Sequence, residues 1–193
     1  MLNVFILIFF IYSFLGWILE VIYSFFQKHK FINRGFLLSP ICPIYGLSSL
    51  LLFFILANFK NNIFLLFILS LIICSFAEYF ISVILEKLFN LRWWDYSKEK
   101  FNINGRVCLK NSIAFGILGV LVVKFITPFL LKFLFTLKNK TINFLTIFLI
   151  IILIIDLIIS SYFSLKIKSK KSNRDSTIKI KNTIYSRIKN FFH

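Results

Sequence analysis

Four acidic side chains interrupt or end long apolar runs in this chain, namely Glu20, Glu78, Glu86 and Asp156. An ionised carboxylate at membrane depth costs several kcal/mol, so it normally needs a partner, a water-filled cavity or a proton. In an enzyme, a carboxylate held in such a place could act as a general base. These residues therefore indicate a polar site inside an otherwise apolar protein, and they are the first candidates for function.

The acidic residues belong to three polar stripes that recur at helical spacing. The stripes are Ser13, Glu20, Ser24 and Gln27; Ser75, Glu78, Ser82 and Glu86; and Asp156, Ser160 and Ser164. We expect these stripes to face the interior of a helix bundle, because lipid offers polar atoms no hydrogen-bond partner. Two interpretations stay open, a functional site and interhelical hydrogen bonds that hold the bundle together. Glu86, near a helix end, is expected to reach water.

Lys110 is the predicted counter-charge for these acids, because it comes early in a helix and at the same predicted depth. We expect it to pair with Glu20, Glu78 or Asp156, and Glu78 is the favoured partner because its helix directly precedes that of Lys110. A broken pair would leave one buried charge uncompensated. The residues predicted to line a substrate-binding site are Glu20, Glu78, Lys110, Asn111, Cys42, Tyr45 and Asp156.

The segment Ser39-Pro40-Ile41-Cys42-Pro43-Ile44-Tyr45-Gly46 is not expected to be regular helix throughout. Its two prolines remove backbone donors and restrict the residues before them. Irregular backbone at membrane depth is tolerated where protein or a water-filled cavity covers it, and broken helices form binding sites in transporters. The alternative is a helix that begins near Pro43 after a lead-in at the membrane interface.

A second group of polar and aromatic residues follows the helix that contains Glu78. The run Arg92-Trp93-Trp94-Asp95-Tyr96 resembles an interfacial belt, since Trp and Tyr favour the headgroup region. Anchoring in the interface explains the aromatic residues, and a functional rim facing the cytoplasm is the alternative. The candidate residues of this rim are Arg34, Arg92, Trp93, Asp95, Asn104 and Arg106.

The elements that must position these residues are predicted to be membrane-spanning helices. The chain has 193 residues, of which 59% are hydrophobic and 27 are phenylalanine, and its apolar runs are long enough to cross a bilayer. We therefore predict an all-α fold, a polytopic integral membrane bundle of five transmembrane helices. They cover residues 3–26, 38–58, 62–88, 107–134 and 143–165, so that residues 1–165 form one transmembrane domain and residues 166–193 a basic tail.

The distribution of basic residues predicts the orientation of this bundle. Of the 23 Lys and Arg residues, seventeen lie in the loops after the first and third helices and in the tail, whereas four lie on the opposite side. The positive-inside rule then predicts an outside N terminus and a cytoplasmic C terminus in a bacterial cytoplasmic membrane. This placement also argues against nucleic-acid binding. The tail is expected to contact anionic lipid as a basic amphipathic helix, or to be a disordered topogenic segment.

The sequence shows few signs of enzyme or metal chemistry. Cys42, Cys74 and Cys108 form no CxxC pair and are expected to be buried apolar side chains. Two histidines are too few for an ordinary zinc site, so no metal and no cofactor are predicted. No Ser-His-Asp set is apparent. A membrane-embedded enzyme using Cys42 as a nucleophile nevertheless remains an alternative.

An ordered set of short motifs resembles a known family. The set comprises Gly16-Trp17-x-x-Glu20, Asn33-Arg34-Gly35-Phe36, Pro40-x-Cys42-Pro43-Ile44-Tyr45-Gly46, Glu78-Tyr79, Arg92-Trp93-Trp94-Asp95-Tyr96-Ser97 and Asn104-Gly105-Arg106. In this order the motifs resemble the bacterial family labelled putative ABC transporter permease, type IV (CmpB-type). The resemblance covers roughly residues 10–130 and excludes the last helix and the tail.

The resemblance implies a transporter permease subunit in the lipid bilayer. The six glycines belong to no GxxxxGK[ST] motif, so an ABC mechanism would need a separate ATPase subunit. Five helices are few for a complete translocation path, which favours a homo-oligomer or a partner. Transport is therefore the leading functional hypothesis. The alternatives are a membrane-embedded enzyme and a membrane scaffold or assembly factor that does not transport.

Overall fold

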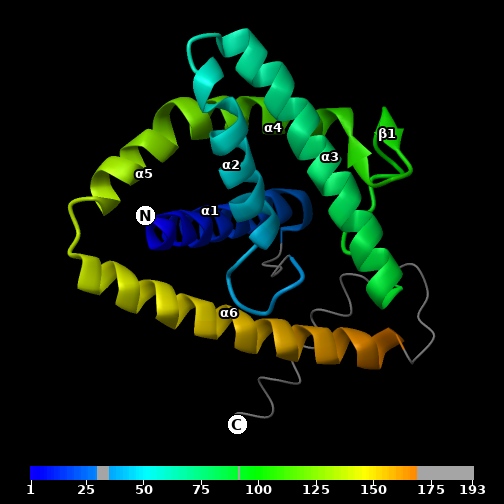
Figure 1. Cartoon of the computed structure of the whole chain (residues 1–193). Helices are drawn as coiled ribbons and strands as arrows, with labels where there is room; N and C mark the ends of the chain where they lie inside the picture. The colour runs from blue at the N-terminus through cyan, green and yellow to red at the C-terminus, as the bar shows by residue number, and fades with distance from the viewer. Residues whose placement is uncertain (30–34, 91, 169–193) are drawn as a thin grey trace.

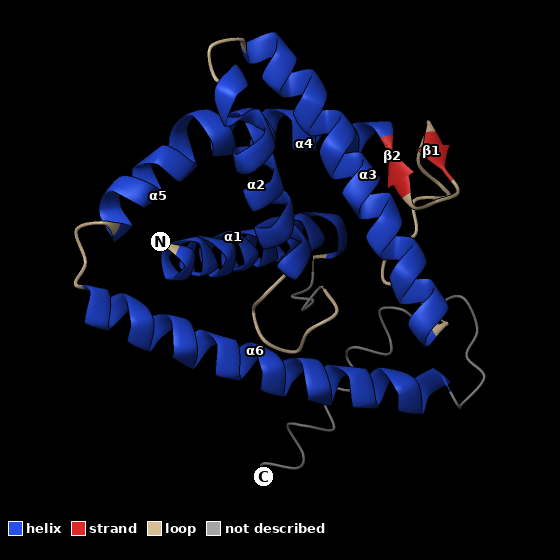
Figure 2. Cartoon of the chain, viewed as in Figure 1, coloured by secondary structure: helices blue, strands red, loops and turns tan. Residues whose placement is uncertain are grey.

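The computed structural model describes residues 1–29, 35–90 and 92–168, and almost all of its ordered elements are helices (Figures 1 and 2). The elements in chain order are α1 (Leu2–Lys28), α2 (Pro43–Leu56), the 3-10 turn η1 (Ala57–Phe59), α3 (Ile63–Phe89), β1 (Asn102–Ile103), β2 (Val107–Cys108), α4 (Leu109–Leu121), the π turn η2 (Val122–Ile126), α5 (Thr127–Leu134) and α6 (Asn139–Lys168). The two short antiparallel strands, which pair Asn102 with Cys108 and Ile103 with Val107, were not predicted.

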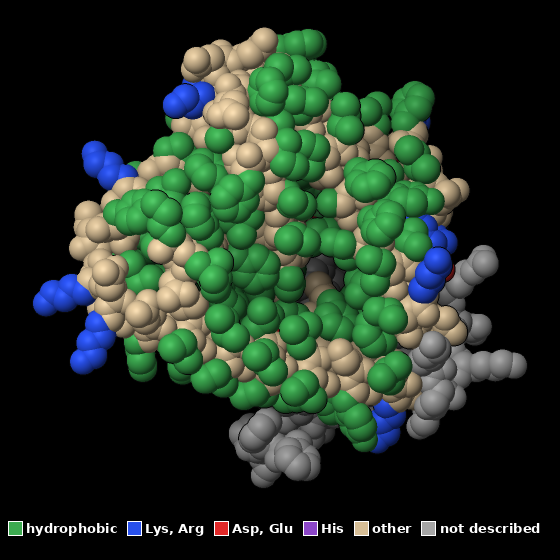
Figure 3. All heavy atoms as spheres, in the orientation of Figure 1, with side chains coloured by type: hydrophobic (Ala, Val, Ile, Leu, Met, Phe, Trp, Pro, Cys, Tyr) green, Lys and Arg blue, Asp and Glu red, His purple; other side chains and the backbone are tan. Residues whose placement is uncertain are grey.

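Four stretches of helix in the described residues are long and apolar enough to cross a membrane: Leu2–Phe26, Ile63–Phe89, Leu109–Leu134 and Asn139–Lys166. Large apolar side chains remain exposed along all four, as expected where lipid is the solvent. Figure 3 shows one face covered mainly by hydrophobic side chains, with Lys and Arg at its edge. The chain is thus a multi-pass membrane protein.

The prediction of a fifth spanning helix over residues 38–58 is not confirmed. Helix α2 begins only at Pro43, and together with η1 it is shorter than the four stretches above. Residues 38–42 are not helical. Pro43 occupies the first turn, where its missing amide costs nothing, and it restricts Cys42 before it to an extended conformation. The expectation that residues 39–46 are not regular helix throughout is therefore confirmed, and the helical part begins at Pro43.

The helices pack as two close pairs, α1 with α2 and α3 with α4, and α6 lies along α1 (Figure 1). Glycines make both pairs close. A Cβ at Gly16 on α1 would collide with the ring of Tyr45 on α2, and one at Gly46 would collide with the Ser13 hydroxyl. In the second pair, Gly119 on α4 faces Ser70 on α3 in the same way. Small residues thus bring neighbouring backbones together, as is common in membranes.

The span Leu109–Leu134 is one bent path made of α4, η2 and α5. The π turn ends directly before Thr127-Pro128, and proline removes one backbone donor from the helix. The Thr127 hydroxyl is fully buried and lies 2.7 Å from the Tyr12 hydroxyl of α1. This contact fixes the start of α5 against the first helix.

Candidate functional site

Glu20 meets the start of α2 through a tyrosine. The Tyr45 hydroxyl donates a hydrogen bond of 2.8 Å to the Glu20 carboxylate. Gly16 lies one helical turn before Glu20, and its missing side chain leaves room for the Tyr45 ring beside α1. The structure therefore explains the motif Gly16-Trp17-x-x-Glu20. Gly16 leaves room for the Tyr45 ring, and the hydroxyl of that ring reaches Glu20.

Glu78 meets a second tyrosine, which the loop after α3 supplies. The Tyr96 hydroxyl donates a hydrogen bond of 3.1 Å to Oε1 of Glu78. Glu78 is only 5% exposed, and its Oε2 has no hydrogen-bond partner within the described residues. Tyr96 is held in place by its own backbone, because its amide donates to the Gly105 carbonyl at 2.7 Å.

The two contacts form one glutamate–tyrosine cluster, consisting of Glu20, Tyr45, Glu78 and Tyr96. Burial raises the pKa of Tyr96 well above its usual range, and the nearby charges of Glu78 and Glu20 raise it further. The charges of both carboxylates therefore act on the Tyr96 hydroxyl, which links Glu20 to Glu78 electrostatically. Because Tyr96 stays protonated at neutral pH, it remains a hydrogen-bond donor to Glu78.

Lys110 does not join this cluster, so the predicted Lys110–Glu78 pair is not formed. Lys110 is exposed, and its ammonium lies 5.6 Å from the centre of the Tyr23 ring. Of the residues described, none with a carboxylate forms an ion pair with it. The prediction failed because Lys110, in the first turn of α4, can reach the bundle surface and stack on an aromatic face.

Asp156 lies elsewhere, where it binds the backbone that leads into α2. We call residues 36–42 the lead-in segment. The carboxylate of Asp156 accepts the Leu38 amide at 3.0 Å, the Ser39 amide at 2.8 Å and the Ser39 hydroxyl, and Ser160 donates to it from one turn further along α6 at 2.8 Å. Backbone amides outside regular helix need acceptors in an apolar setting, and Asp156 supplies them here. Asp156 therefore supports irregular backbone, which agrees with the structural interpretation of its stripe, although the sequence did not predict its backbone partners.

The lead-in segment reaches deep into the fold. The Cys42 amide donates to the Ser13 carbonyl at 3.0 Å, and Ser13 lies halfway along α1. Cys42 is buried and is the residue before the first turn of α2. Asn111 is partly buried in the first turn of α4, and no metal-binding group of His, Cys, Asp and Glu was found among the described residues.

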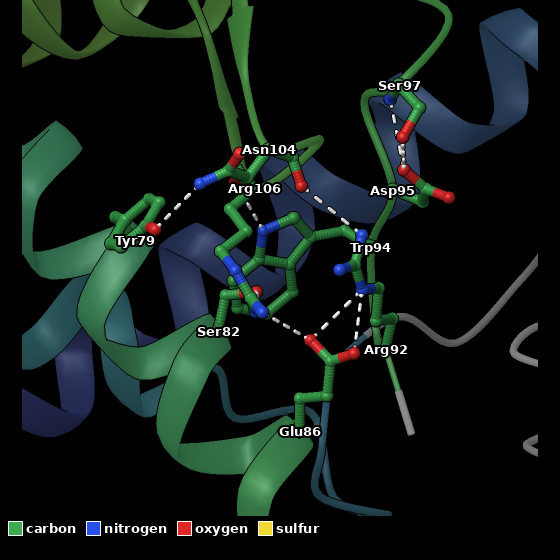
Figure 4. A network of polar contacts seen from close by, with 9 residues as sticks. All are labelled: Tyr79, Ser82, Glu86, Arg92, Trp94, Asp95, Ser97, Asn104 and Arg106. Atoms are coloured by element: carbon green, nitrogen blue, oxygen red, sulfur yellow. Dashed lines mark hydrogen bonds and ion pairs between the residues drawn. The ribbon is translucent and has the colours of Figure 1, made fainter. Parts of the chain in front are cut away.

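The predicted rim residues Arg92, Asn104 and Arg106 form a compact latch on the end of α3 (Figure 4). Both arginines pair with Glu86, Arg92 at 3.0 Å and Arg106 at 2.6 Å. Arg106 also donates to Ser82 at 3.1 Å, and Asn104 donates to the Tyr79 hydroxyl at 3.0 Å. Glu86, expected only to reach water, instead anchors the loop.

The other rim residues lie around this latch. Trp93 packs against Phe36 of the lead-in segment and Phe89 of α3, with ring centres 5.4 and 5.5 Å apart. Asp95 accepts the amide and hydroxyl of Ser97 and so shapes the turn. The indole of Trp94 donates to the Arg106 carbonyl at 2.9 Å. Arg34 and the basic tail beyond residue 168 lie outside the described residues.

Of the residues that the sequence singled out, the structure brings Glu20, Tyr45 and Glu78 together, and it places Lys110 and Asp156 apart from them. Tyr96 is the site residue that we missed. Its motif was visible as Trp93-Trp94-Asp95-Tyr96, but it was interpreted as an interfacial belt. Nothing in the spacing of Tyr96 predicts that the loop folds back over α3.

Comparison with known proteins supports a transport assignment at family level. Searches of curated proteins and of solved structures found no match. The family model described as "Putative ABC-transporter type IV" matches residues 7–161. The match confirms the resemblance seen in the motifs and extends it through most of α6, which we had placed outside. The chain therefore belongs to the putative ABC-transporter type IV family.

Proposed function

We propose that this protein is the membrane-embedded permease component of a transporter and that the glutamate–tyrosine cluster is its polar site. The family match and the four apolar spans support the general assignment. The observation that carries the site is the convergence of two acids and two hydroxyls from α1, α2, α3 and the following loop. Polar groups at such depth mark substrate or ion pathways in membrane proteins.

The lead-in segment and α2 complete this site in the proposal. Their backbone turns from extended to helical beside the middle of α1, and the first turn of α2 carries Tyr45 into the cluster. We infer that residues 36–59 together make a fifth crossing. In its non-helical part, Asp156 accepts hydrogen bonds from backbone amides that would be paired with carbonyls in a continuous helix. Discontinuous helices of this kind form the binding sites of many transporters.

The proposed energy source is a separate ATPase subunit, because the chain contains no P-loop sequence. Affinity purification of the full chain in mild detergent, followed by mass spectrometry, should identify a nucleotide-binding partner and any bound solute. Reconstitution of the two proteins in liposomes should then give ATP-dependent flux of that solute. The double variant Glu20→Gln and Glu78→Gln should lose the flux, whereas Glu99→Gln in the loop should retain it. Undiminished flux in the double variant would remove the cluster from the proposed path.

The proposed orientation places the N terminus outside and the cluster toward the cytoplasm. All three native cysteines are buried, so a single introduced cysteine will report cleanly. An impermeant maleimide should label Asn61→Cys, between η1 and α3, in intact cells. It should label Lys98→Cys, in the loop after α3, only after the cells are opened. The reverse pattern would overturn the orientation.

A further inference from the structure

Glu78 is the one acid of the described spans with a buried oxygen that has no hydrogen-bond partner among the described residues. Glu78 is only 5% exposed, its Oε1 accepts from Tyr96, and its Oε2 has no donor among the described residues. A carboxylate that keeps its charge in such a place loses hydration without full replacement. The neutral carboxylic acid loses far less, because it carries no net charge to desolvate.

No Lys or Arg among the described residues forms an ion pair with Glu78. Arg106 pairs with Glu86 and donates to Ser82, and Lys110 lies over the Tyr23 ring at the surface. The second charge that does act on the cluster is that of Glu20, which has the same sign. Two carboxylates that share one site do not both ionise readily, and one of them then holds a proton.

We propose that Glu78 is a proton-binding site, whose proton is held at neutral pH and tuned by the hydroxyl of Tyr96 and the charge of Glu20. The reaction is simple protonation, in which a carboxylate oxygen takes one proton and the side chain becomes neutral. The proposal gives the polar site of the permease a ligand, the proton. It shares that site with the proposed function but requires no transport activity.

The titratable groups that face this region come from each element around it. They are Glu20 of α1, Cys42 and Tyr45 at the start of α2, Cys74 on α3 itself, Tyr96 of the loop and Cys108 of β2. On α6, Asp156 is already engaged with the lead-in segment and Ser160. Of these groups, Tyr96 and Glu20 act on Glu78 in opposite directions. A hydroxyl donor favours the charged carboxylate, and a second negative charge favours the neutral acid.

Infrared spectroscopy of the full chain in lipid nanodiscs tests the proposal directly. The carbonyl stretch of a protonated carboxyl should be present at neutral pH, shift in heavy water and disappear in Glu78→Gln. The control Glu99→Gln should keep it. A wild-type protein without this band at neutral pH, or a Glu78→Gln variant that retains it at full intensity, would overturn the assignment.

The pH dependence of the same infrared band distinguishes a proton-binding residue from a purely structural one. In Tyr96→Phe the band should persist to higher pH than in the wild type, because the donor to the carboxylate is gone. In Glu20→Gln it should be lost at lower pH, because the neighbouring negative charge is gone. Each midpoint should move by about one pH unit. Identical midpoints in all three proteins would show that neither group tunes Glu78.

Labelling of the wild type covers the case in which Glu78→Gln does not fold. A hydrophobic carbodiimide reacts with protonated carboxyls, so mass spectrometry should find its adduct on Glu78 at neutral pH and less of it at alkaline pH. Absence of the adduct together with absence of the infrared band would reject the site. A band and adduct without ATP-dependent flux would keep the proton site and reject the permease function.

Discussion

Glu78 and Glu86 lie about two turns apart on one stripe of α3, yet their surroundings differ in every respect that matters for chemistry. Glu86 is partly exposed and receives two arginines, so its charge is neutralised and its oxygens are matched. Glu78 is buried, receives one neutral hydroxyl and keeps an oxygen without a donor. The first carboxylate holds a loop in place, and the second is available to bind a ligand.

Asp156 extends this comparison to a third case. It is as buried as Glu78, but two amides and two hydroxyls surround its oxygens. Burial by itself therefore does not distinguish a functional acid from a structural one in this protein. The distinction lies in whether the local donors account for the carboxylate oxygens, and only Glu78 among these three fails that test.

Removal of the Asp156 carboxylate should have the largest effect on stability. Asp156→Ala removes the carboxylate that accepts the Leu38 and Ser39 amides, at a cost of about 3 kcal/mol in the free energy of unfolding. Asp156→Asn keeps one carbonyl acceptor and should lose less. Thermal unfolding of the detergent-purified proteins measures both. Equal stability of wild type and Asp156→Ala would show that the lead-in segment does not depend on this acid.

A methyl group at Gly16 should disturb the cluster from the other side. Gly16→Ala forces its new Cβ into the Tyr45 ring, at a cost of about 2 kcal/mol. The double variant Gly16→Ala and Tyr45→Gly removes both the ring and the Cβ that obstruct the new methyl group, so it should be less unstable than the sum of the two single changes. Additive losses in the thermal unfolding of the four proteins would contradict a direct contact.

The ion pair between Glu86 and Arg106 in the rim latch should contribute less to stability than the two contacts above, because solvent screens its charges. Glu86→Gln and Arg106→Leu should each destabilise the loop, and a double-mutant cycle should give a coupling of about 1 kcal/mol. High salt should reduce that coupling. A coupling energy of zero at low salt would mean that the ion pair adds nothing to the stability of the loop.

Lys110 should show the smallest effect, because the structure places it at the surface. Lys110→Met should change stability by less than about 0.5 kcal/mol and should be additive with Glu78→Gln. Strong coupling between the two substitutions would restore the ion pair that the sequence suggested, and it would undermine the description of Glu78 as an acid without a cation.

Much of the architecture was predictable from residue order. The lengths of the apolar runs placed all four spans within a few residues, because a bilayer of fixed thickness requires about 20 apolar residues per helix. Pro40 and Pro43 indicated the break before α2, since proline acts on the local backbone. The ordered motifs also identified the family. All of these features depend on local chemistry or on length.

The partners of the acids were decided by the tertiary structure. Depth along a helix can be counted from the sequence, and on that basis Lys110 and Glu78 seemed matched. Contact also requires the right angular position, and that depends on how Gly16, Gly46 and Gly119 bring the helices together. Tyr96 reaches Glu78 because Glu86 and two arginines fold its loop back over α3. Long-range packing and loop closure decide which of several donors at equal depth contacts each carboxylate. Neither can be deduced from the sequence alone.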